Sequence, residues 1–489
     1  MRGTGMNEDC ELGIIGLAVM GQNLALNIMN SGYRVAGYNR TSSVTRQFVK
    51  QRVEKEDFFP AYELEELVGG LRKPRIILLL VKAGPPVDSV IDDLIPLLDQ
   101  EDIIIDGGNS YFKDTEHRYK KLADRGIRYL GTGVSGGEYG ALHGPSLMPG
   151  GDRSAYDEVE NILKDAAAKT KNGYCVSFLG PRSAGHYVKM IHNGIEYGIM
   201  EIIAEIYDIM HKVLSLKYEK MAALFAEWNE EHESYLMEIS AEILEKKDNE
   251  TKQPLLDVIL DKAAQKGTGK WSAREGLNLG VPVPTITAGV KARYYSAFKT
   301  ERQKISKKMN KEAETTKINL TEEDIIKVLG DALHVGTVIT YVEGMKLLQA
   351  ASKEYEYKLD LSEVARIWED GCIIRSSHLE LIQRAYKQHN QPENDGLDLI
   401  SNLLMAPEVR REIRGKIISL RKLITEIKKV GIPLPALNGV LDYIDSFSSL
   451  KLPANMIQAQ RDYFGAHSYE RVDKKGTFHT EWQDIHNIT

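Results

Sequence analysis

The 489-residue sequence contains little cysteine, no long apolar run and no basic excess. Cys10, Cys175 and Cys372 lie far apart without a CxxC pair, which argues against both a disulfide framework and a zinc site of ordinary spacing. No uninterrupted apolar run reaches the roughly 18 residues of a membrane span. Glu8 and Asp9 stand where a secretory signal needs an apolar core. We therefore expect a soluble, cytoplasmic protein without a membrane partner.

The charge balance excludes a second class of partner. The formal net charge is -7, so the chain lacks the basic excess with which nucleic-acid-binding proteins neutralise phosphates. We expect no nucleic-acid partner. Apolar residues make up 42% of the chain, which at this length is enough for two or three domains.

The pattern of the sequence changes near residue 183. Before it, short β-like runs alternate with helical segments, as in an open α/β sheet of parallel strands with crossover helices. The strand candidates are Leu12–Ile15, Arg34–Tyr38, Arg75–Val81, Asp102–Ile105, Ile127–Leu130 and Tyr174–Phe178. After it, helical periodicity dominates to about residue 448. We expect a Rossmann-like doubly wound domain in residues 1–182, an all-helical domain in 183–452, and a tail in 453–489 whose aromatic side chains pack on another surface, such as a second subunit.

The first chemical motif directly follows the first strand candidate. Gly16-x-Ala18-x-x-Gly21 has the spacing of a dinucleotide fingerprint, in which small residues bring a helix N-terminus close to a pyrophosphate. A plain strand-turn-helix is the alternative. The position of the motif at the start of a βαβ pattern disfavours that alternative.

The end of the second strand candidate indicates which dinucleotide is bound. An NAD site places a carboxylate about 20 residues after the glycines to accept from the ribose hydroxyl. Asn39, Arg40 and Thr41 stand there instead, and a cation with a hydroxyl suits a 2′-phosphate. An arginine at a strand end is more often a surface residue, but this one occupies the discriminating position. We expect NADP as the cofactor.

A polar stripe on a predicted helix is the strongest candidate for chemistry. In KMIHNGIEYGI, Lys189, His192, Asn193, Glu196 and Tyr197 follow the i, i+3, i+4, i+7, i+8 spacing that places them on one helix face. Such a stripe normally faces solvent. Here it combines a potential base, a potential acid and several hydrogen-bonding groups.

Other candidates lie in glycine-rich turns and basic segments. Ser135-Gly136-Gly137 offers a hydroxyl and open backbone NH groups to an anion, although such turns are commonly structural. Lys266 and Thr268 stand in a basic, glycine-containing turn that lacks P-loop spacing, so nucleotide hydrolysis is not indicated. The remaining candidate anion ligands are Arg293, Arg461 and His467.

Together these segments resemble one family, the decarboxylating 6-phosphogluconate dehydrogenases, which are NADP-linked enzymes of the pentose phosphate pathway. The matching stretches run in the family's order from Gly16 to His467: GLAVMG, NRT, VKAG, DGGNS, GVSGGEYGALHGPSLMPGG, KMIHNGIEYGIME, KGTGKW, GCIIRS and QAQRDYFGAH.

The resemblance implies the residues of each subsite. The NADP contacts would be Gly16, Leu17, Ala18, Val19, Met20, Gly21, Asn39, Arg40, Thr41, Val81, Lys82, Ala83 and Asn109. The sugar-acid contacts would be Asn109, Ser135, Gly136, Gly137, His192 and Asn193. The substrate phosphate would be held by Tyr197, Lys266, Thr268 and Arg293, with Arg461 and His467 reaching in from the tail of the other subunit of a homodimer.

The resemblance also implies the reaction, the oxidative decarboxylation of 6-phospho-D-gluconate to D-ribulose 5-phosphate and CO₂. Lys189 matches the family's general base and Glu196 its general acid. A lysine that acts as a base at neutral pH needs burial or nearby positive charge to lower its pKa. No metal is implied, because a β-keto acid contains its own electron sink.

Two alternatives remain. A non-catalytic NADP(H)-binding sensor or scaffold would be expected to have lost Lys189 or Glu196, and both are present. A related β-hydroxyacid dehydrogenase with an unphosphorylated substrate would lack the phosphate-binding set, which this chain retains.

Overall fold

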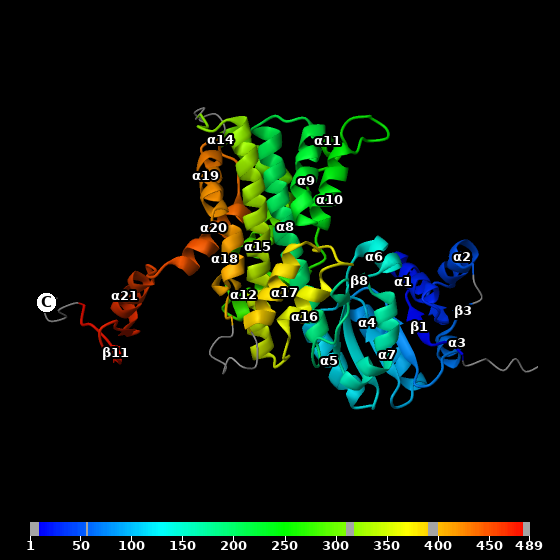
Figure 1. The fold of residues 1–489 in the computed structure, drawn as a ribbon. Helices are drawn as coiled ribbons and strands as arrows, with labels where there is room; N and C mark the ends of the chain where they lie inside the picture. Colours follow the sequence, from blue (N-terminus) through cyan, green and yellow to red (C-terminus); the bar gives the residue numbers. More distant parts are fainter. Residues whose placement is uncertain (1–8, 55–56, 310–316, 390–399, 483–489) are drawn as a thin grey trace, which may run out of the picture. The chain divides into compact units, whose positions relative to one another are not determined.

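The structure, a computed structural model, describes residues 9–54, 57–309, 317–389 and 400–482 (Figure 1). The chain forms two compact units, Met1–Val440 and Leu441–Thr489. This division does not test the predicted boundaries at 182/183 and 452/453, which stay predictions.

The first part of the larger unit is built on a seven-stranded sheet with the order β3-β2-β1-β4-β5-β6-β7. Its strands are β1 Leu12–Ile15, β2 Val35–Tyr38, β3 Phe58–Ala61, β4 Ile76–Leu79, β5 Ile103–Asp106, β6 Arg128–Val134 and β7 Leu147–Gly151. All neighbouring strands pair in parallel except β6 and β7, which are antiparallel. The predicted Rossmann-like doubly wound sheet is thus confirmed, with one antiparallel edge strand added.

Helices cover both faces of this sheet. They are α1 Val19–Asn30, α2 Ser42–Arg52, α3 Leu64–Gly69, α4 Pro85–Leu94, α5 Phe112–Ala123, α6 Gly137–His143 and α7 Arg153–Ala166, with a 3₁₀ turn, η1 Ile95–Leu97. Side chains of α1, α2 and α7 form one core with Leu12 and Ile14, whereas α3, α4 and α5 form the other with Ile15. Because both faces are buried, strands such as β4 are continuous apolar runs without alternation.

Three details of the predicted sheet are corrected. The two edge strands, β3 and β7, were not predicted, and each contains a proline, Pro60 or Pro149, which cannot donate to a sheet ladder and is tolerated at edges. The strand predicted at Ile127–Leu130 extends to Val134, into the segment interpreted as a glycine-rich turn. That segment also contains α6 and β7.

The last predicted strand, Tyr174–Phe178, does not join the sheet. Only β8 Lys169–Thr170 and β9 Gly173–Tyr174 pair there, as a separate two-stranded hairpin. Val176 forms an isolated bridge to Leu147 and is buried in the sheet's core. The apolar run therefore reflects packing against the edge of the sheet rather than a continuous ladder.

From residue 184 to 440 the named elements among the described residues are all helices, as predicted. They are α8 Ala184–Lys212, α9 Tyr218–His232, α10 Tyr235–Glu245, α11 Leu255–Val258, α12 Thr268–Asn278, α13 Pro284–Ala297, α14 Lys299–Met309, α15 Glu322–Glu354, α16 Leu361–Ile367, α17 His378–His389, η3 Leu403–Met405, α18 Pro407–Ile413 and α19 Lys416–Lys428, and α20 Pro435–Ser448 begins there. The long helices α8 and α15 lie side by side at the centre of this bundle (Figure 1).

Helix α15 has the length and apolar composition of a membrane span, with a mean hydropathy of 1.4 in its most apolar window. That window is 78% buried inside the protein, and residues such as Leu333, Ile339 and Met345 are fully buried. The hydrophobicity of α15 therefore belongs to a core helix.

The second unit is organised around one buried carboxylate. It contains α21 Ala454–Gly465 and the two-stranded hairpin of β10 Tyr469–Glu470 and β11 Thr477–Phe478. Asp462 accepts hydrogen bonds from the backbone of Ser468 and Thr480 and from the indole NH of Trp482, and its side chain contacts His479. These contacts tie the hairpin to the end of α21.

Candidate active site

The predicted cofactor residues lie at the carboxyl ends of the parallel strands. The connection from β1 to α1 begins at Gly16, whose φ of +102° favours glycine. A Cβ at Gly16 would lie 2.6 Å from the Leu80 carbonyl oxygen, and one at Gly21 would lie 1.9 Å from that of Gly16. Larger residues would open this turn. Small residues are therefore required at both ends of the fingerprint.

The N-terminus of α1 remains available to an anion. Ala18 is its N-cap residue and provides no side-chain hydrogen bond to the first-turn NH groups. The Leu17 NH donates to Asn39 Oδ1 at 3.1 Å, which joins the fingerprint turn to the end of β2. Arg40 and Thr41 follow at the surface. This arrangement fits a dinucleotide whose pyrophosphate meets the helix and whose adenosine ribose meets Arg40.

The other cofactor candidates border the same turn. Val19 is exposed and Met20 half-buried at the start of α1. Val81, Lys82 and Ala83 follow β4, and a Cβ built on Gly16 would lie 3.1 Å from Val81 Cγ1.

A second set of predicted site residues lies after β5 and β6. Asn109, with φ +53°, makes two hydrogen bonds to the Val134 backbone, and Ser135, Gly136 and Gly137 follow directly.

Helix α8 packs directly on β6 and β7, and this contact buries the polar stripe. A Cβ at Gly185 would lie 2.2 Å from the Met148 carbonyl oxygen, and a Cβ at Gly133 would lie 2.4 Å from Lys189 Cβ. The glycines thus let the helix approach the sheet closely. Lys189 and His192 are 4% and 0% exposed, so the stripe faces inward rather than toward solvent.

The stripe forms one chain of polar contacts. Asn193 Nδ2 donates to Thr268 Oγ1 at 3.0 Å, which turns its Oδ1 toward His192 Nδ1, also at 3.0 Å. Because an amide oxygen only accepts, Nδ1 carries the imidazole proton. His192 Nε2 then accepts from the Ser135 hydroxyl at 3.0 Å. The stripe is therefore connected to both β6 and α12.

Lys189 lies at one end of this series of polar contacts and is a potential base. Its Nζ lies 3.2 Å from the protonated Nδ1 of His192, a contact in which a neutral amine accepts and an ammonium does not. Burial lowers the pKa of Lys189 from 10.5 to about 8, against the opposing effect of Glu196. Burial and nearby Lys189 also hold the pKa of His192 well below 6.5. An appreciable fraction of Lys189 is therefore neutral near neutral pH.

Glu196 provides the complementary group. It lies seven residues beyond Lys189, which is about 10 Å along a helix axis. Its side chain is 21% exposed, and burial raises its pKa although Lys189 and Arg293 lower it. A raised pKa suits a carboxylic acid that delivers a proton.

Beyond Glu196, positively charged side chains form one end of the site. The Arg293 guanidinium stacks on the Tyr197 ring, with Cζ 3.6 Å from the centroid, and is largely buried. A Cβ at Gly269 would lie 2.4 Å from the Tyr197 ring, so α12 packs closely against it. Lys266 is exposed on the turn before Thr268.

Two predicted residues belong to the second unit, and their role at the site of a partner subunit stays a prediction. Arg461 and His467 are exposed and belong to the second unit. Every other predicted residue lies in the first unit, either around the strand ends, along α8, α12 and α13, or, for Lys266, on the turn before α12.

Two residues near the stripe were not predicted. The Trp368 ring meets His192 edge-on, with 5.7 Å between centroids, and helps to enclose it. Glu201 lies one turn beyond Tyr197, and burial raises its pKa to about 7 despite the lowering effect of Arg293. The i+4 spacing of Glu201 from Tyr197 was a usable signal, whereas the contact with Trp368 joins distant parts of the chain.

Comparison with known proteins identifies the family. A model of the NAD binding domain of 6-phosphogluconate dehydrogenase matches residues 11–180, and one of the 6-phosphogluconate dehydrogenase C-terminal domain matches residues 185–482. The NADP(+)-dependent decarboxylating 6-phosphogluconate dehydrogenase of Bacillus subtilis (strain 168) is 48% identical over 473 residues, covering 96% of this chain and 99% of the relative.

Two further similarities extend this result. The NAD(+)-dependent decarboxylating enzyme of the same organism is 45% identical, covering 97% of this chain and 99% of the relative. The structure of Plasmodium falciparum 6-phosphogluconate dehydrogenase, described in its apo form and with NADP+ or 6-phosphogluconate, covers 97% of this chain and 100% of its own with 44% identity and a TM-score of 0.90. The chain belongs to the 6-phosphogluconate dehydrogenase family.

Proposed function

We propose that this protein catalyses the oxidative decarboxylation of 6-phospho-D-gluconate to D-ribulose 5-phosphate and CO₂, with reduction of NADP to NADPH, in the oxidative pentose phosphate pathway. The observation that carries the proposal is the buried Lys189 amine, whose pKa is about 8 and which lies on a polar stripe bordered by the strand ends. The family membership and the NADP-dependent relative support it.

NADP is the cofactor that these residues fit. The Gly16–Gly21 turn and the uncapped N-terminus of α1 would hold the pyrophosphate. Arg40 and Thr41 would hold the 2′-phosphate, because Arg40 occupies the place of the carboxylate that selects NAD. When bound, the nicotinamide supplies the hydride acceptor.

The substrate would lie along the stripe. Its carboxylate and hydroxyl groups would meet Asn109, the Ser135–Gly137 turn, His192 and Asn193. Its phosphate would meet Tyr197, Lys266, Thr268 and Arg293, of which Arg293 is the buried cation. The stripe therefore runs from the proton-transfer groups to an anion-binding end.

Lys189 and Glu196 would divide the proton transfers. Neutral Lys189 would accept the proton of the C3 hydroxyl as C3 is oxidised to a ketone. The resulting ammonium would give its proton to the new carbonyl oxygen while the C1 carboxylate leaves as CO₂, and the electrons of the broken C1–C2 bond would form the C2–C3 double bond of an enediol. Protonated Glu196 would then donate its proton to the enediol carbon that becomes C1 of ribulose 5-phosphate, while Lys189 takes back the proton of the neighbouring hydroxyl as the C2 ketone forms.

The direct test measures both products in one reaction. The protein is mixed with NADP and 6-phosphogluconate, and NADPH formation and CO₂ release are followed together. Equal amounts of the two are expected. A folded preparation that binds NADP but forms neither product would refute the catalytic proposal and favour a sensor or scaffold.

We also propose that the protein is a homodimer in which the tail of each subunit completes the site of the other. Helix α21 exposes Met456, Ile457 and Phe464 by 60% or more, and such a surface is suited to burial against a partner. Arg461 and His467 are exposed in the same segment. They would add two phosphate ligands to the partner's Arg293 end.

A mixed-dimer experiment tests this arrangement. An Arg461→Ala subunit is combined with a Lys189→Ala subunit, and the heterodimer is purified by two affinity tags. If sites are shared, one site carries both lesions and the other carries neither, so about half of the wild-type activity should return. A heterodimer as inactive as its parents would contradict the shared site while leaving the proposed reaction untouched.

The proposed location is the cytoplasm. Cys10, Cys175 and Cys372 are all free and buried, which suits a reducing compartment. Fractionation of cells with an antibody to the protein tests this location, and recovery in a membrane or secreted fraction would contradict it.

A further inference from the structure

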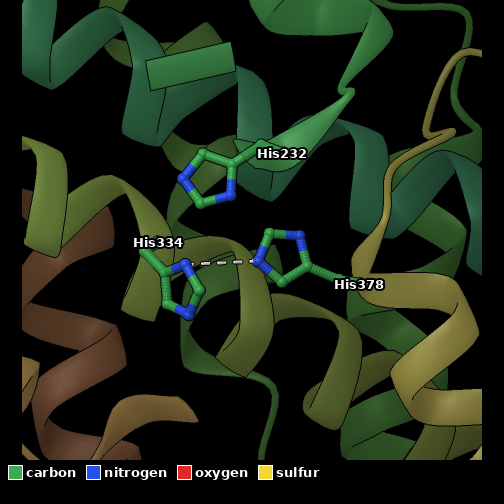
Figure 2. Close-up of side chains that lie close together, drawn as sticks. All are labelled: His232, His334 and His378. Carbon is green, nitrogen blue, oxygen red and sulfur yellow. Dashed lines mark hydrogen bonds between the residues drawn. The ribbon is translucent and has the colours of Figure 1, made fainter. Parts of the chain in front are cut away.

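A cluster of three buried histidines lies apart from the residues of the proposed active site. His232 is the last residue of α9, His334 lies within α15, and His378 is the first residue of α17. Their exposed fractions are 6%, 6% and 5%. Figure 2 shows the three rings gathered around one small region, with His334 and His378 joined by a contact between ring nitrogens.

The spacing of the ring nitrogens suits one metal ion. One nitrogen from each histidine lies within 4.8 Å of the other two, and His378 Nε2 is 3.5 Å from His334 Nδ1. Ligand nitrogens about 2.0–2.1 Å from a tetrahedral zinc ion are roughly 3.4 Å apart. The pair formed by His334 and His378 already has this separation, and a side-chain adjustment of up to about 1.4 Å would bring His232 to it.

The second ring nitrogens of His334 and His378 lie near groups of the kind that orient metal-binding histidines. If His334 Nδ1 is a ligand, its Nε2 is directed at Glu412 Oε2, 3.7 Å away. That Nε2 is buried and has no hydrogen-bond partner among the described residues. If His378 Nε2 is a ligand, its Nδ1 contacts the Ser376 hydroxyl at 3.2 Å. Metal-bound histidines commonly use their second nitrogen in this way.

We propose that His232, His334 and His378 bind a divalent transition-metal ion of the zinc type, which links α9, α15 and α17. Three imidazole donors favour Zn²⁺, Co²⁺ or Ni²⁺ over the oxygen-seeking Mg²⁺ and Ca²⁺. The fourth position of a tetrahedral ion would be taken by water or another small ligand. The site would be structural, since none of its residues belongs to the proposed catalytic set.

Charged groups near the three histidines have opposing effects on the binding of a cation. Burial lowers the pKa of His232 to about 4 and that of His334 to about 3, so the imidazoles are neutral donors at neutral pH. Lys416 also lowers both values, and its positive charge opposes a bound cation. Glu231 acts on His232 in the opposite direction but less strongly than Lys416, and Glu412 Oε2 lies 3.7 Å from His334 Nε2. Simple ring packing is the competing interpretation, because His232 and His378 stack at 4.9 Å.

The test uses the full-length protein after EDTA treatment and removal of the chelator. Zn²⁺ binding is measured by calorimetry, Co²⁺ binding by its visible absorption, and Mg²⁺ serves as the negative control. We expect one Zn²⁺ per chain and a strong tetrahedral-type Co²⁺ spectrum. Zn²⁺ at 100 times its dissociation constant should shift the folding equilibrium about 100-fold and raise the melting temperature.

Variants then locate the ion. His334→Ala and His378→Gln should each lose at least about 100-fold in Zn²⁺ affinity, since even the loss of an orienting group costs roughly 10- to 100-fold. Glu412→Gln tests such an orienting group and should lose about 10-fold. His117→Ala, which removes an exposed histidine of α5, is the matched control and should bind normally.

Two results would overturn the proposal. One is the absence of Zn²⁺ and Co²⁺ binding to the folded wild-type protein, a result that does not depend on the stability of any variant. The other is undiminished binding in both His334→Ala and His378→Gln, which would place the ion elsewhere. NADP affinity, measured in the same samples, verifies that each variant is folded.

Discussion

Gly133→Ala should reduce catalysis by misplacing Lys189. The added Cβ would lie 2.4 Å from Lys189 Cβ and 2.9 Å from its Cγ, with Met148 Cβ 3.3 Å away on another side. Carbon atoms in ordinary contact are about 3.5–4.0 Å apart, so Lys189 or its helix must move by roughly 1 Å or more. A displacement of this size at a reacting group can cost about 100-fold in rate. We expect kcat to fall by about that factor.

A matched variant distinguishes a loss of kcat caused by misplacing Lys189 from one caused by lower stability of the protein. Gly131 lies two residues earlier on β6, and its added Cβ would lie 2.6 Å from Thr115 Cγ2 and 2.9 Å from His186 Nδ1. Overpacking at either glycine should destabilise the protein by about 1–3 kcal/mol. Only Gly133→Ala crowds the proposed base directly. Gly131→Ala should therefore retain a kcat within a few fold of the wild type.

Steady-state NADPH formation and urea unfolding measure the two effects. Both variants are compared with the wild type at saturating NADP and 6-phosphogluconate, below the temperature at which either variant unfolds. The reasoning would be refuted by a folded Gly133→Ala protein with near-normal kcat. Equal losses of kcat in the two variants would also refute it, because crowding would then act through general destabilisation.

Lys189→Met should stabilise the protein by about 3 kcal/mol at pH 7, because the shift of the Lys189 pKa from 10.5 to about 8 corresponds to a charge-burial cost of that size. Between pH 8 and 10.5 Lys189 keeps its proton in the unfolded chain but loses it in the folded chain, so the stability of the wild type rises with pH over this range. Urea unfolding should therefore show that Lys189→Met is more stable than the wild type below pH 8 and has no such advantage above pH 10.5. For the wild type, kcat/KM should fall about tenfold per pH unit below pH 8 and level off above it, since the base must be neutral; a profile that stays flat down to pH 6 would exclude Lys189 as the base. Arg40→Ala should raise the KM for NADP about 10- to 100-fold, the equivalent of one lost charge-assisted contact, and leave the KM for NAD nearly unchanged. Equal changes for both cofactors would remove Arg40 from 2′-phosphate recognition.

The sequence was sufficient to predict the central strands but not the edges of the sheet. Strands β1, β2, β4 and β5 are apolar runs because they are covered on both faces. The edge strands β3 and β7 contain Pro60 and Pro149, and local preference argues against a strand there. Their pairing depends on neighbouring strands, which local sequence patterns do not reveal.

The composition of the polar stripe was predictable, whereas its electrostatics were not. Helical spacing alone aligns Lys189, His192 and Glu196. The low pKa of Lys189 depends on its burial, with Gly133 of β6 packed against its side chain. These contacts join segments that are far apart in the sequence. Periodicity therefore predicts which side chains share a face, and tertiary packing decides their protonation.

The histidine cluster illustrates the same limit. His232, His334 and His378 come from three helices and show no metal-ligand spacing in the sequence. The sequence therefore does not indicate a metal site. Only the packing of α9, α15 and α17 brings their ring nitrogens together.

The most direct measurement follows the atoms of the substrate. The protein is incubated with NADP and 6-phosphogluconate that carries deuterium at C3 and ¹³C at C1, and the products are analysed by mass spectrometry. The proposed reaction predicts deuterium in NADPH and ¹³C in CO₂, in equal amounts, with neither label left in ribulose 5-phosphate. Deuterium retained in the sugar, or NADPH formed without labelled CO₂, would contradict oxidation at C3 followed by loss of C1.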